Sequence, residues 1–450
     1  MHLIPENVIK NLLSFWSGEY KGLDTGSEDY ELEPAALEAI GSACVAAGDT
    51  TPAAFGARVP NLVTQRHYFT AESYTQFATF HGPVVLRRRF SKPKYYNHYL
   101  DLVQIFNDCL RMSIDREYVD VTLRRRIVDW VQTFEKIYYQ YKPHRLSTCV
   151  LTIHALLHIP DDILNGGPMW CYWNYITERY VGFLVRSSKS RKNPYASFAR
   201  RIREISQNSI IKLTYRLRDE LDLSDGREED RSGHSLAHCV LFLRNPDICV
   251  LRPHRRGNVT AALRKAIERY LLLSFEVNAQ QARDIVPEEI SHWGKISFLN
   301  GGDKIRGADL CQASEKNMTR DASFYSHDVD KNARHPRRPV VLERRVAYGQ
   351  LLRVLEFHAD LPTITDDNGR VTQRPSVLLL AVIRPVKIQA ASARLGTPYY
   401  QDGQFSPIKV VDVDDISCLV ARIPAPGSGP KKWALCERFD AMGVSAQELD

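Results

Sequence analysis

The spacing of apolar residues changes along this chain, and that change limits which folds it can adopt. In the N-terminal half, apolar side chains recur every three to four positions, as expected for helices that bury one side. After Pro339 the apolar residues are β-branched and alternate with polar ones between turn residues. The sequence therefore predicts an α+β protein, with a mainly helical N-terminal half followed by a small antiparallel β domain.

Individual helices are expected where this spacing meets a start or stop signal. Pro34 suits a first turn, Thr70 is a candidate N-cap, and Ser147 is expected to cap a helix broken at Pro160. The expected helical ranges are 1–17, 34–47, 70–80, 95–112, 117–141, 147–159 and 177–187. The aromatic stretch MWCYWNY, residues 169–175, predicts a short strand or a tight connection.

The chain is expected to divide into three regions. Residues 1–220 form the helical domain, residues 221–338 a linker with mixed helical and loop structure, and residues 339–450 the β domain. The acidic, apolar-poor stretch 222–235 is typical of a linker. The rest of the middle region is expected to hold strands at 236–251, a helix at 259–284 and mostly loop at 294–338.

Cysteine spacing and hydropathy exclude several protein classes. The nine cysteines contain no CxxC pair, which argues against a zinc ribbon and indicates reduced thiols. The N-terminus does not resemble a secretory signal, and the apolar run 377–383 is too short to span a bilayer. We therefore expect no membrane partner and a location in the nucleus, with the cytosol as the alternative.

The positive charge of the chain is concentrated in one segment, residues 178–220. This segment holds eleven basic and four acidic residues, so its net charge of +7 equals that of all 450 residues. Aromatic residues are interleaved with the basic ones, a pattern that suits phosphate contact and base stacking. The segment therefore predicts a DNA-binding surface, and the alternative is a solvated helix face with ion pairs. The residues expected to contact DNA are Arg179, Arg186, Lys189, Arg191, Lys192, Arg200, Arg201 and Arg203.

Glu178 opens this segment and is the one candidate for catalytic chemistry. A carboxylate at the start of a helix could hold a divalent metal, provided that further carboxylates converge on it from elsewhere in the chain. The alternative is a surface glutamate placed favourably by the helix dipole.

Two histidines, His154 and His158, lie four positions apart on one expected helix. That spacing can bring two imidazoles to one metal ion, but the glutamate of an HExxH motif is absent and the surroundings are apolar. A packed helix with hydrogen-bonded histidines is the favoured interpretation. Shorter basic clusters lie at residues 87–89, 124–126 and 334–345, and intrahelical pairing would explain much of the second.

The chain resembles the transposases of CACTA-type (En/Spm-like) DNA transposons in their fungal form. The most specific similarity is LSTCVLTIHALLHIPDDILNGGPMWCYWNYITERYVGFL, which resembles the HxxxH helix, Gly-Pro, aromatic stretch and Glu-Arg-aromatic motif of that family. The segments MHLIPENVIKNLLSFWSGEYKGLD, RDASFYSHDVDKNARHPRRPV and YGQLLRVLEF are also similar to family regions. The similarity covers nearly the whole chain.

The resemblance implies an RNase-H-like fold that cuts and joins DNA with Mg²⁺ held by three acids. Glu178 matches the third acid on the last core helix, and residues 1–165 match the helical insertion before it. His154 and His158 would then be structural or supportive, and the basic segment would face DNA.

The match departs from the family in its metal site, because the regions that carry the first two acids have no counterpart in residues 1–450. One acid of three cannot hold two ions in line with a phosphodiester. We therefore expect a catalytically incomplete, transposase-derived protein that binds DNA and needs no cofactor. The alternatives are a protein–protein adaptor acting through the β domain and an Mg²⁺-dependent transposase completed by upstream residues, in which Glu178 would bind the metal.

Overall fold

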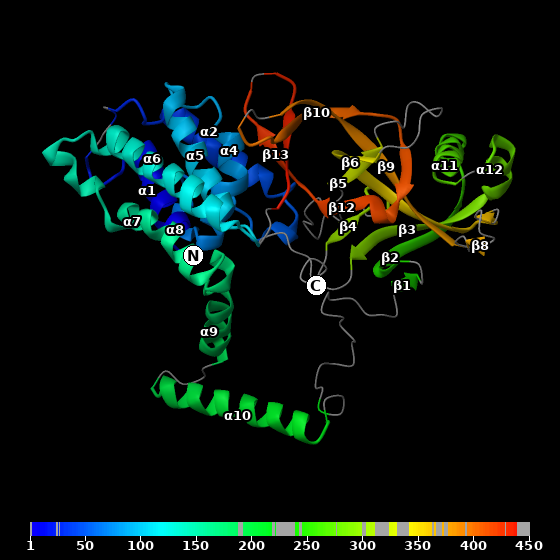
Figure 1. The fold of residues 1–450 in the computed structure, drawn as a ribbon, viewed down its shortest axis with the longest axis horizontal. Coiled ribbons are helices and arrows are strands. Elements are labelled where there is room, and N and C mark those ends of the chain that lie inside the picture. Colours follow the sequence, from blue (N-terminus) through cyan, green and yellow to red (C-terminus); the bar gives the residue numbers. More distant parts are fainter. Residues whose placement is uncertain are drawn as a thin grey trace.

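The protein is α+β, with helices gathered in one half and an antiparallel sheet in the other (Figure 1). This architecture agrees with the sequence-based prediction at the level of fold class. The computed structural model describes residues 2–23, 26, 28–187, 192–217, 221, 239–242, 245–275, 277–298, 303–310, 324–330, 342–361, 364–365, 371–372, 377–391, 394–427 and 429–438.

Residues 3–171 form the helical body. Its principal helices are α1 (Lys10–Trp16), α2 (Pro34–Ala47), α3 (Ala71–Gln76), α4 (Gly82–Val85), α5 (Pro93–Cys109), α6 (Arg124–Phe134), α7 (Leu151–Ala155) and α8 (Ile159–Gly166). π-helical turns precede α1 at Leu3–Ile9 and α6 at Tyr118–Leu123. Two more follow α3 at Phe77–His81 and α6 at Glu135–Tyr139. Five 3₁₀ turns complete it, at Ala53–Phe55, Arg66–Tyr68, Pro143–Thr148, Leu156–His158 and Met169–Cys171.

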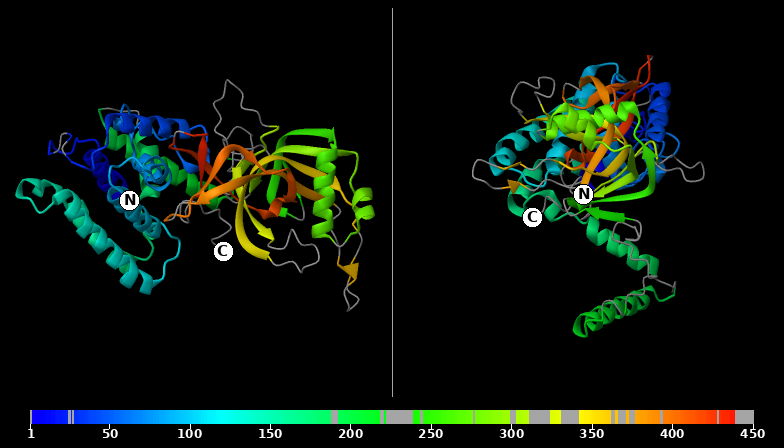
Figure 2. Two further views of the ribbon diagram at one scale, coloured as in Figure 1. Left: turned by 90° about the horizontal axis from the view of Figure 1, so that it is seen from above. Right: turned by 90° about the vertical axis from the view of Figure 1, so that its right-hand side faces the viewer.

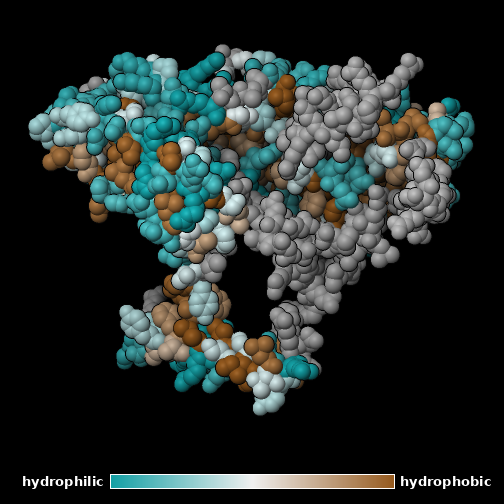
Figure 3. Space-filling view, viewed as in Figure 1, coloured by the Kyte–Doolittle hydropathy of each residue, from teal (hydrophilic) through white to brown (hydrophobic). Residues whose placement is uncertain are grey.

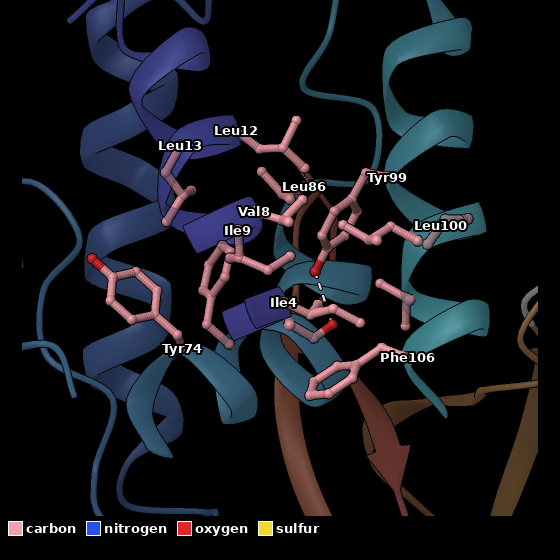
Figure 4. Packing of buried hydrophobic residues seen from close by; sticks show 14 of the residues in the cluster. Ile4, Val8, Ile9, Leu12, Leu13, Tyr74, Leu86, Tyr99, Leu100 and Phe106 are labelled. Atoms are coloured by element: carbon pink, nitrogen blue, oxygen red, sulfur yellow. Dashed lines mark hydrogen bonds between the residues drawn. The ribbon is translucent and has the colours of Figure 1, made fainter. Parts of the chain in front are cut away.

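The core of the helical body is aromatic and tightly packed. Phe15 is fully buried and stacks on Tyr20 and Tyr138, with ring centroids 3.9 and 4.5 Å away. The Tyr99 hydroxyl donates a hydrogen bond to the Ala78 carbonyl at 2.9 Å, which satisfies a polar group inside the core (Figure 4). Burial of this many large side chains is the main stabilising contribution to the body.

Local capping signals placed some helices correctly and one incorrectly. The α2 helix begins at Pro34, and the Thr70 hydroxyl accepts from the Ser73 amide at the start of α3, as predicted. Ser147 is not an N-cap, because it lies inside the 3₁₀ turn that precedes α7. Pro160 lies in the first turn of α8, which begins at Ile159, instead of ending a helix, since proline also suits a first turn. The stretch 169–175 contains a 3₁₀ turn and no strand, so the tight connection was the correct alternative.

Two further helices, α9 (Tyr175–Ser187) and α10 (Pro194–Thr214), form what we call the arm. The α9 helix leaves the helical body, and α10 lies apart from both halves of the molecule (Figures 1 and 2). No residue of α10 is buried. Among the residues that the structure describes, no helix combines the length and the apolarity required to cross a membrane.

The second half is built on a curled sheet of twelve strands, in which every pairing is antiparallel. The main path runs β1-β2-β3-β6-β9-β10-β14-β13. The strands are β1 (Cys239–Phe242), β2 (Asn245–Asn258), β3 (Glu289–Phe298), β4 (Lys304–Arg306), β5 (Phe324–Asp330), β6 (Leu342–His358), β9 (Val377–Ala391), β10 (Pro398–Phe405), β11 (Lys409–Asp412), β12 (Ile416–Leu419), β13 (Ala421–Ala425) and β14 (Lys432–Cys436). A separate hairpin joins β7 (Ile364–Thr365) to β8 (Val371–Thr372).

Two helices, α11 (Ala261–Ser274) and α12 (Ala279–Ile285), pack on one face of the sheet. Leu263, Ile267 and Leu271 of α11 enter the same apolar cluster as Leu355 and Leu380 of the central strands. A single helix was predicted over 259–284. It is divided because Asn278 accepts hydrogen bonds from two amides and starts α12 with a capping box.

Residues 294–338 were predicted to be mostly loop, but the described part of this range is mostly strand. It contains the end of β3 and all of β4 and β5. The sequences of β4 and β5 are rich in polar residues, so the pattern along the chain alone did not reveal them; β4 pairs with β3, and β5 pairs with β6 and β12. The predicted linker at 222–235 lies outside the described residues.

The β13–β14 hairpin joins the sheet to the helical body. Ile423 and Ala434 belong to the same hydrophobic cluster as the core of the body, and β13 packs against α2 and α4. The Arg422 amide donates to the Thr50 carbonyl at 3.0 Å, and the Thr50 hydroxyl donates to the Arg422 carbonyl at 2.5 Å. The β13 edge of the sheet is therefore covered by helices rather than open for a partner strand.

Candidate nucleic-acid interface

Glu178 lies in the first turn of α9 and is half exposed, but it is not isolated. The Nε2 atom of His2 lies 2.8 Å from its carboxylate, and the Nδ1 atom of the same ring lies 2.6 Å from the carboxylate of Glu6. The hydrogen bond to Glu178 raises the pKa of His2 above its ordinary value, and Glu6 adds to this while burial opposes it. The base of the arm is therefore tied to the first helical turn of the body.

This arrangement bears on the predicted metal site at Glu178. The imidazole stands between the two carboxylates, so Glu178 and Glu6 do not converge on one point where an ion could sit. Within the described ranges, no three His, Cys, Asp or Glu side chains are placed to hold a metal ion. The donor set around Glu178 does not fit Mg²⁺, which requires several oxygen ligands in near-octahedral geometry.

A cavity of ≈ 630 Å³ opens beside Glu6, on the outside of the helical body. Its principal cation is Arg66, whose guanidinium donates to Glu19 at 2.9 Å, to the Ser14 hydroxyl at 2.7 Å and to the Lys10 carbonyl at 3.1 Å. Arg66 is therefore already paired with Glu19, and the cavity is lined by two acids, Glu6 and Glu19, as well as by the two cations Lys10 and Arg66, so its charge is balanced.

His154 and His158 lie on α7 and the 3₁₀ turn that follows it. Their Nε2 atoms are 3.3 Å apart, so one ring can donate a hydrogen bond to the other. Both residues are exposed, whereas the favoured interpretation had placed them on a packed helix. The structure gives them no link to Glu178, and a supportive role for them stays a prediction.

The basic residues of the predicted interface are carried by the arm. Arg186 lies in the last turn of α9, Lys192 follows in the connection, and Arg200, Arg201 and Arg203 lie on α10; all five are exposed. The side chain of Arg179, and Lys189 and Arg191 as a whole, lie outside the described residues.

The first half of α10 separates charge from apolar surface. At 100° per residue, Arg200 and Arg203 share one side of the helix, and the opposite side carries the stripe Tyr195, Phe198, Ile202 and Ile205. Arg201 forms a long ion pair of 3.9 Å with Glu204. For Arg200 and Arg203 no carboxylate partner is found in the described part of the chain. The alternative of a solvated helix face with ion pairs is met in part, since these residues are exposed and Arg201 is paired with Glu204, whereas Arg200 and Arg203 are not neutralised within the described residues.

Exposed aromatic rings accompany these cations along the arm. Tyr180 and Phe183 lie on α9 with their ring centroids 6.2 Å apart, and Tyr195 and Tyr215 flank α10. The arm therefore presents apolar and charged side chains together, away from the rest of the molecule (Figure 3). Such a surface can form salt links with phosphates and stack on unpaired bases.

Comparison with known proteins supplies no relative for this chain. No family model matches it, and neither the curated proteins nor the solved structures give a significant match. What the protein binds must therefore be inferred from its own residues.

Proposed function

We propose that this chain is a transposase-derived protein that binds DNA through the arm, with Arg200, Arg201 and Arg203 as the central phosphate contacts. The observation that carries the proposal is that α10, which holds three cations within four residues, buries nothing and stands apart from both halves. Exposed apolar and charged side chains on a helix that contributes so little to the core suit contacts made outside the protein.

The sequence resemblance supports the same proposal from a different direction. The resemblance to the CACTA-type family implies that Glu178 lies on the last helix of an RNase-H-like core and that the basic segment 178–220 faces DNA. The finer proposal is that residues 1–165 correspond to the helical insertion of that core, and that α9 corresponds to its last helix.

Strand cleavage is not part of this proposal for residues 1–450 alone. Glu178 is the one acid here that matches the metal triad of the family, and His2 occupies its carboxylate. Mg²⁺-dependent chemistry would require two further carboxylates from outside these residues and the displacement of His2 from Glu178.

The proposal is tested by reversing the charge of the arm with Arg200→Glu, Arg201→Glu and Arg203→Glu together. Affinity for a 20-base-pair duplex should fall by about tenfold or more in low salt, because each lost phosphate contact also loses its counterion release. The slope of log K against log salt should become shallower by about two to three. Fluorescence anisotropy over a salt series measures both quantities.

A matched variant separates local contact from net charge. Lys94→Glu, Arg125→Glu and Lys136→Glu make the same change in net charge at exposed positions of the helical body. If this control lowers affinity as much as the arm variant does, DNA does not bind the arm in particular. If neither variant changes affinity or slope, the proposal is wrong.

A further inference from the structure

A second cavity, of ≈ 190 Å³, lies on the seam between the helical body and the sheet. Its walls come from the turn after α4 and from four strands, β9, β10, β13 and β14, or the residue that directly follows one of them. The lining residues are Arg87, Arg88, Gln389, Tyr399, Ala425, Pro426 and Lys432. Arg87 and Arg88 belong to the basic cluster at residues 87–89, which lies outside the arm.

Strand pairing determines which side chains reach this cavity. Lys432 of β14 pairs with Gln401 of β10 on one side and with Ala425 of β13 on the other. The side-chain amide of Gln389 on β9 donates a hydrogen bond to the side-chain oxygen of Gln401 at 3.3 Å. The Lys432 ammonium group and the Gln389 amide thus line the cavity together with the arginines that follow α4, and Gln401 connects their two strands.

The charge of this cavity is unbalanced. Three of its lining residues are cations and none is acidic. In the described part of the chain, neither Arg88 nor Lys432 has a carboxylate partner. The cavity beside Glu6 differs, because its arginine is neutralised by Glu19. Cations held together without a counter-charge repel one another, and an anion between them relieves that repulsion.

Tyr399 supplies a rigid wall and a neutral donor. It is 5% exposed, and the Arg87 guanidinium lies 5.2 Å from the centre of its ring, which orients the arginine. Burial raises the pKa of the Tyr399 hydroxyl, and the effect of Arg87 in the opposite direction is smaller. The hydroxyl therefore stays protonated at neutral pH and adds no negative charge to the cavity.

The backbone at Arg88 is held in an unfavourable conformation. Its φ of +60° lies in the left-handed region, which arginine rarely adopts. Glycine or asparagine would be the expected residue in a turn that serves only to end a helix. Such strain is concentrated at ligand-binding positions in proteins, where the side chain is needed for contact.

We propose that this cavity binds a phosphate group, with Arg87, Arg88 and Lys432 as charged contacts and Tyr399 as a hydroxyl donor. Guanidinium groups suit phosphate because they donate two parallel hydrogen bonds to its oxygens. The phosphate could belong to a small phosphorylated molecule or to a nucleic-acid backbone. The site is independent of the arm, since the β13–β14 hairpin lies between the two halves at the top of Figure 1, whereas α10 lies at the bottom of that view.

The direct test is calorimetric titration of the full chain with sodium pyrophosphate. Arg88→Asn should weaken binding by about tenfold, because one charge-assisted contact is lost, and Arg88→Asn with Lys432→Gln should weaken it by about a hundredfold. Arg88→Asn should leave the melting temperature equal or higher, since asparagine tolerates a positive φ better than arginine does. Lys431→Gln is the control, because Lys431 packs over the Trp433 ring and does not line the cavity.

A competition experiment distinguishes the two sources of phosphate. If the ligand is a nucleic-acid backbone, duplex DNA competes with pyrophosphate, and Lys432→Gln makes the salt slope for DNA shallower by about one. If the ligand is a small molecule, pyrophosphate binds without competition from DNA. Both outcomes support the site, and the triple reversal on α10 should leave pyrophosphate affinity unchanged in either case. The proposal is overturned if the double variant binds pyrophosphate as tightly as the wild type, or if pyrophosphate does not bind and the DNA slope is unaltered.

Discussion

The helical body and the arm are both helical, yet they are stabilised in different ways. In the body, the long helices α5 and α6 bury one apolar side, and Phe15 of α1 stacks on Tyr138 in the same core. In α10, the apolar residues have a comparable spacing but remain on the surface, and Ile202 is 39% exposed. Apolar periodicity therefore predicts that a helix forms, but not whether its apolar side is buried within the same chain.

The largest loss in the free energy of unfolding is expected for a substitution in the core of the body. Phe15→Ala is expected to lower the free energy of unfolding by about 3–5 kcal/mol, because it removes a buried ring and leaves a cavity. Tyr68→Ala is the control, since Tyr68 lies in the same body but is 65% exposed. Urea unfolding followed by circular dichroism measures both. Equal losses in the two variants would mean that the aromatic cluster is not what stabilises the body.

A smaller, pH-dependent effect is expected where the body meets the arm. Because its pairing with Glu178 raises the pKa of folded His2 above 6.5, this pairing stabilises the folded protein fully below pH 6.5. The contribution is lost as the pH rises through the raised value. His2→Gln should therefore lower the melting temperature at about pH 5.5, which is below the ordinary histidine pKa. At about pH 8.5 the substitution should have little effect.

The control for this titration is His67→Gln, an exposed histidine of the body without a carboxylate partner among the described residues. It should show no comparable pH-dependent difference. A destabilisation by His2→Gln that grew with pH would contradict the pairing of His2 with Glu178.

The smallest effect is expected within the arm itself. Ile202→Ala should change the free energy of unfolding by no more than about 0.5 kcal/mol, as is usual for exposed positions. The same substitution at buried Ile127 should cost about 2–5 kcal/mol. A loss above about 1.5 kcal/mol at Ile202 would show that α10 packs against something in solution, and it would remove the contrast between arm and body.

Much of the fold could be predicted because its signals are local. Proline at a first turn, a threonine cap and a four-residue apolar repeat identified α2, α3 and the long helices without any knowledge of the tertiary structure. The α+β class followed from the change in periodicity after Pro339. The strand β5 could not be found in this way, because its stability comes from pairing with distant residues of β6 and β12.

The candidate sites depended even more on contacts between distant residues. The basic residues of the arm could be named from the sequence because they are contiguous. His2 and Glu178 are 176 positions apart, and no pattern along the chain indicates that they meet. The same is true of the cavity on the seam, where Arg88 and Lys432 are brought together by the packing of the β13–β14 hairpin on the helical body.

That hairpin has a consequence for how the chain is made. It supplies Ile423 and Ala434 to a core whose other members come mainly from the first helices. During synthesis, about 370 residues separate the end of α2 from β13, which corresponds to roughly 20–75 s at usual elongation rates. For that interval the surfaces of α2 and α4 that later receive β13 are uncovered on the ribosome. The nascent protein is therefore a natural client for chaperones until almost its last described strand has emerged.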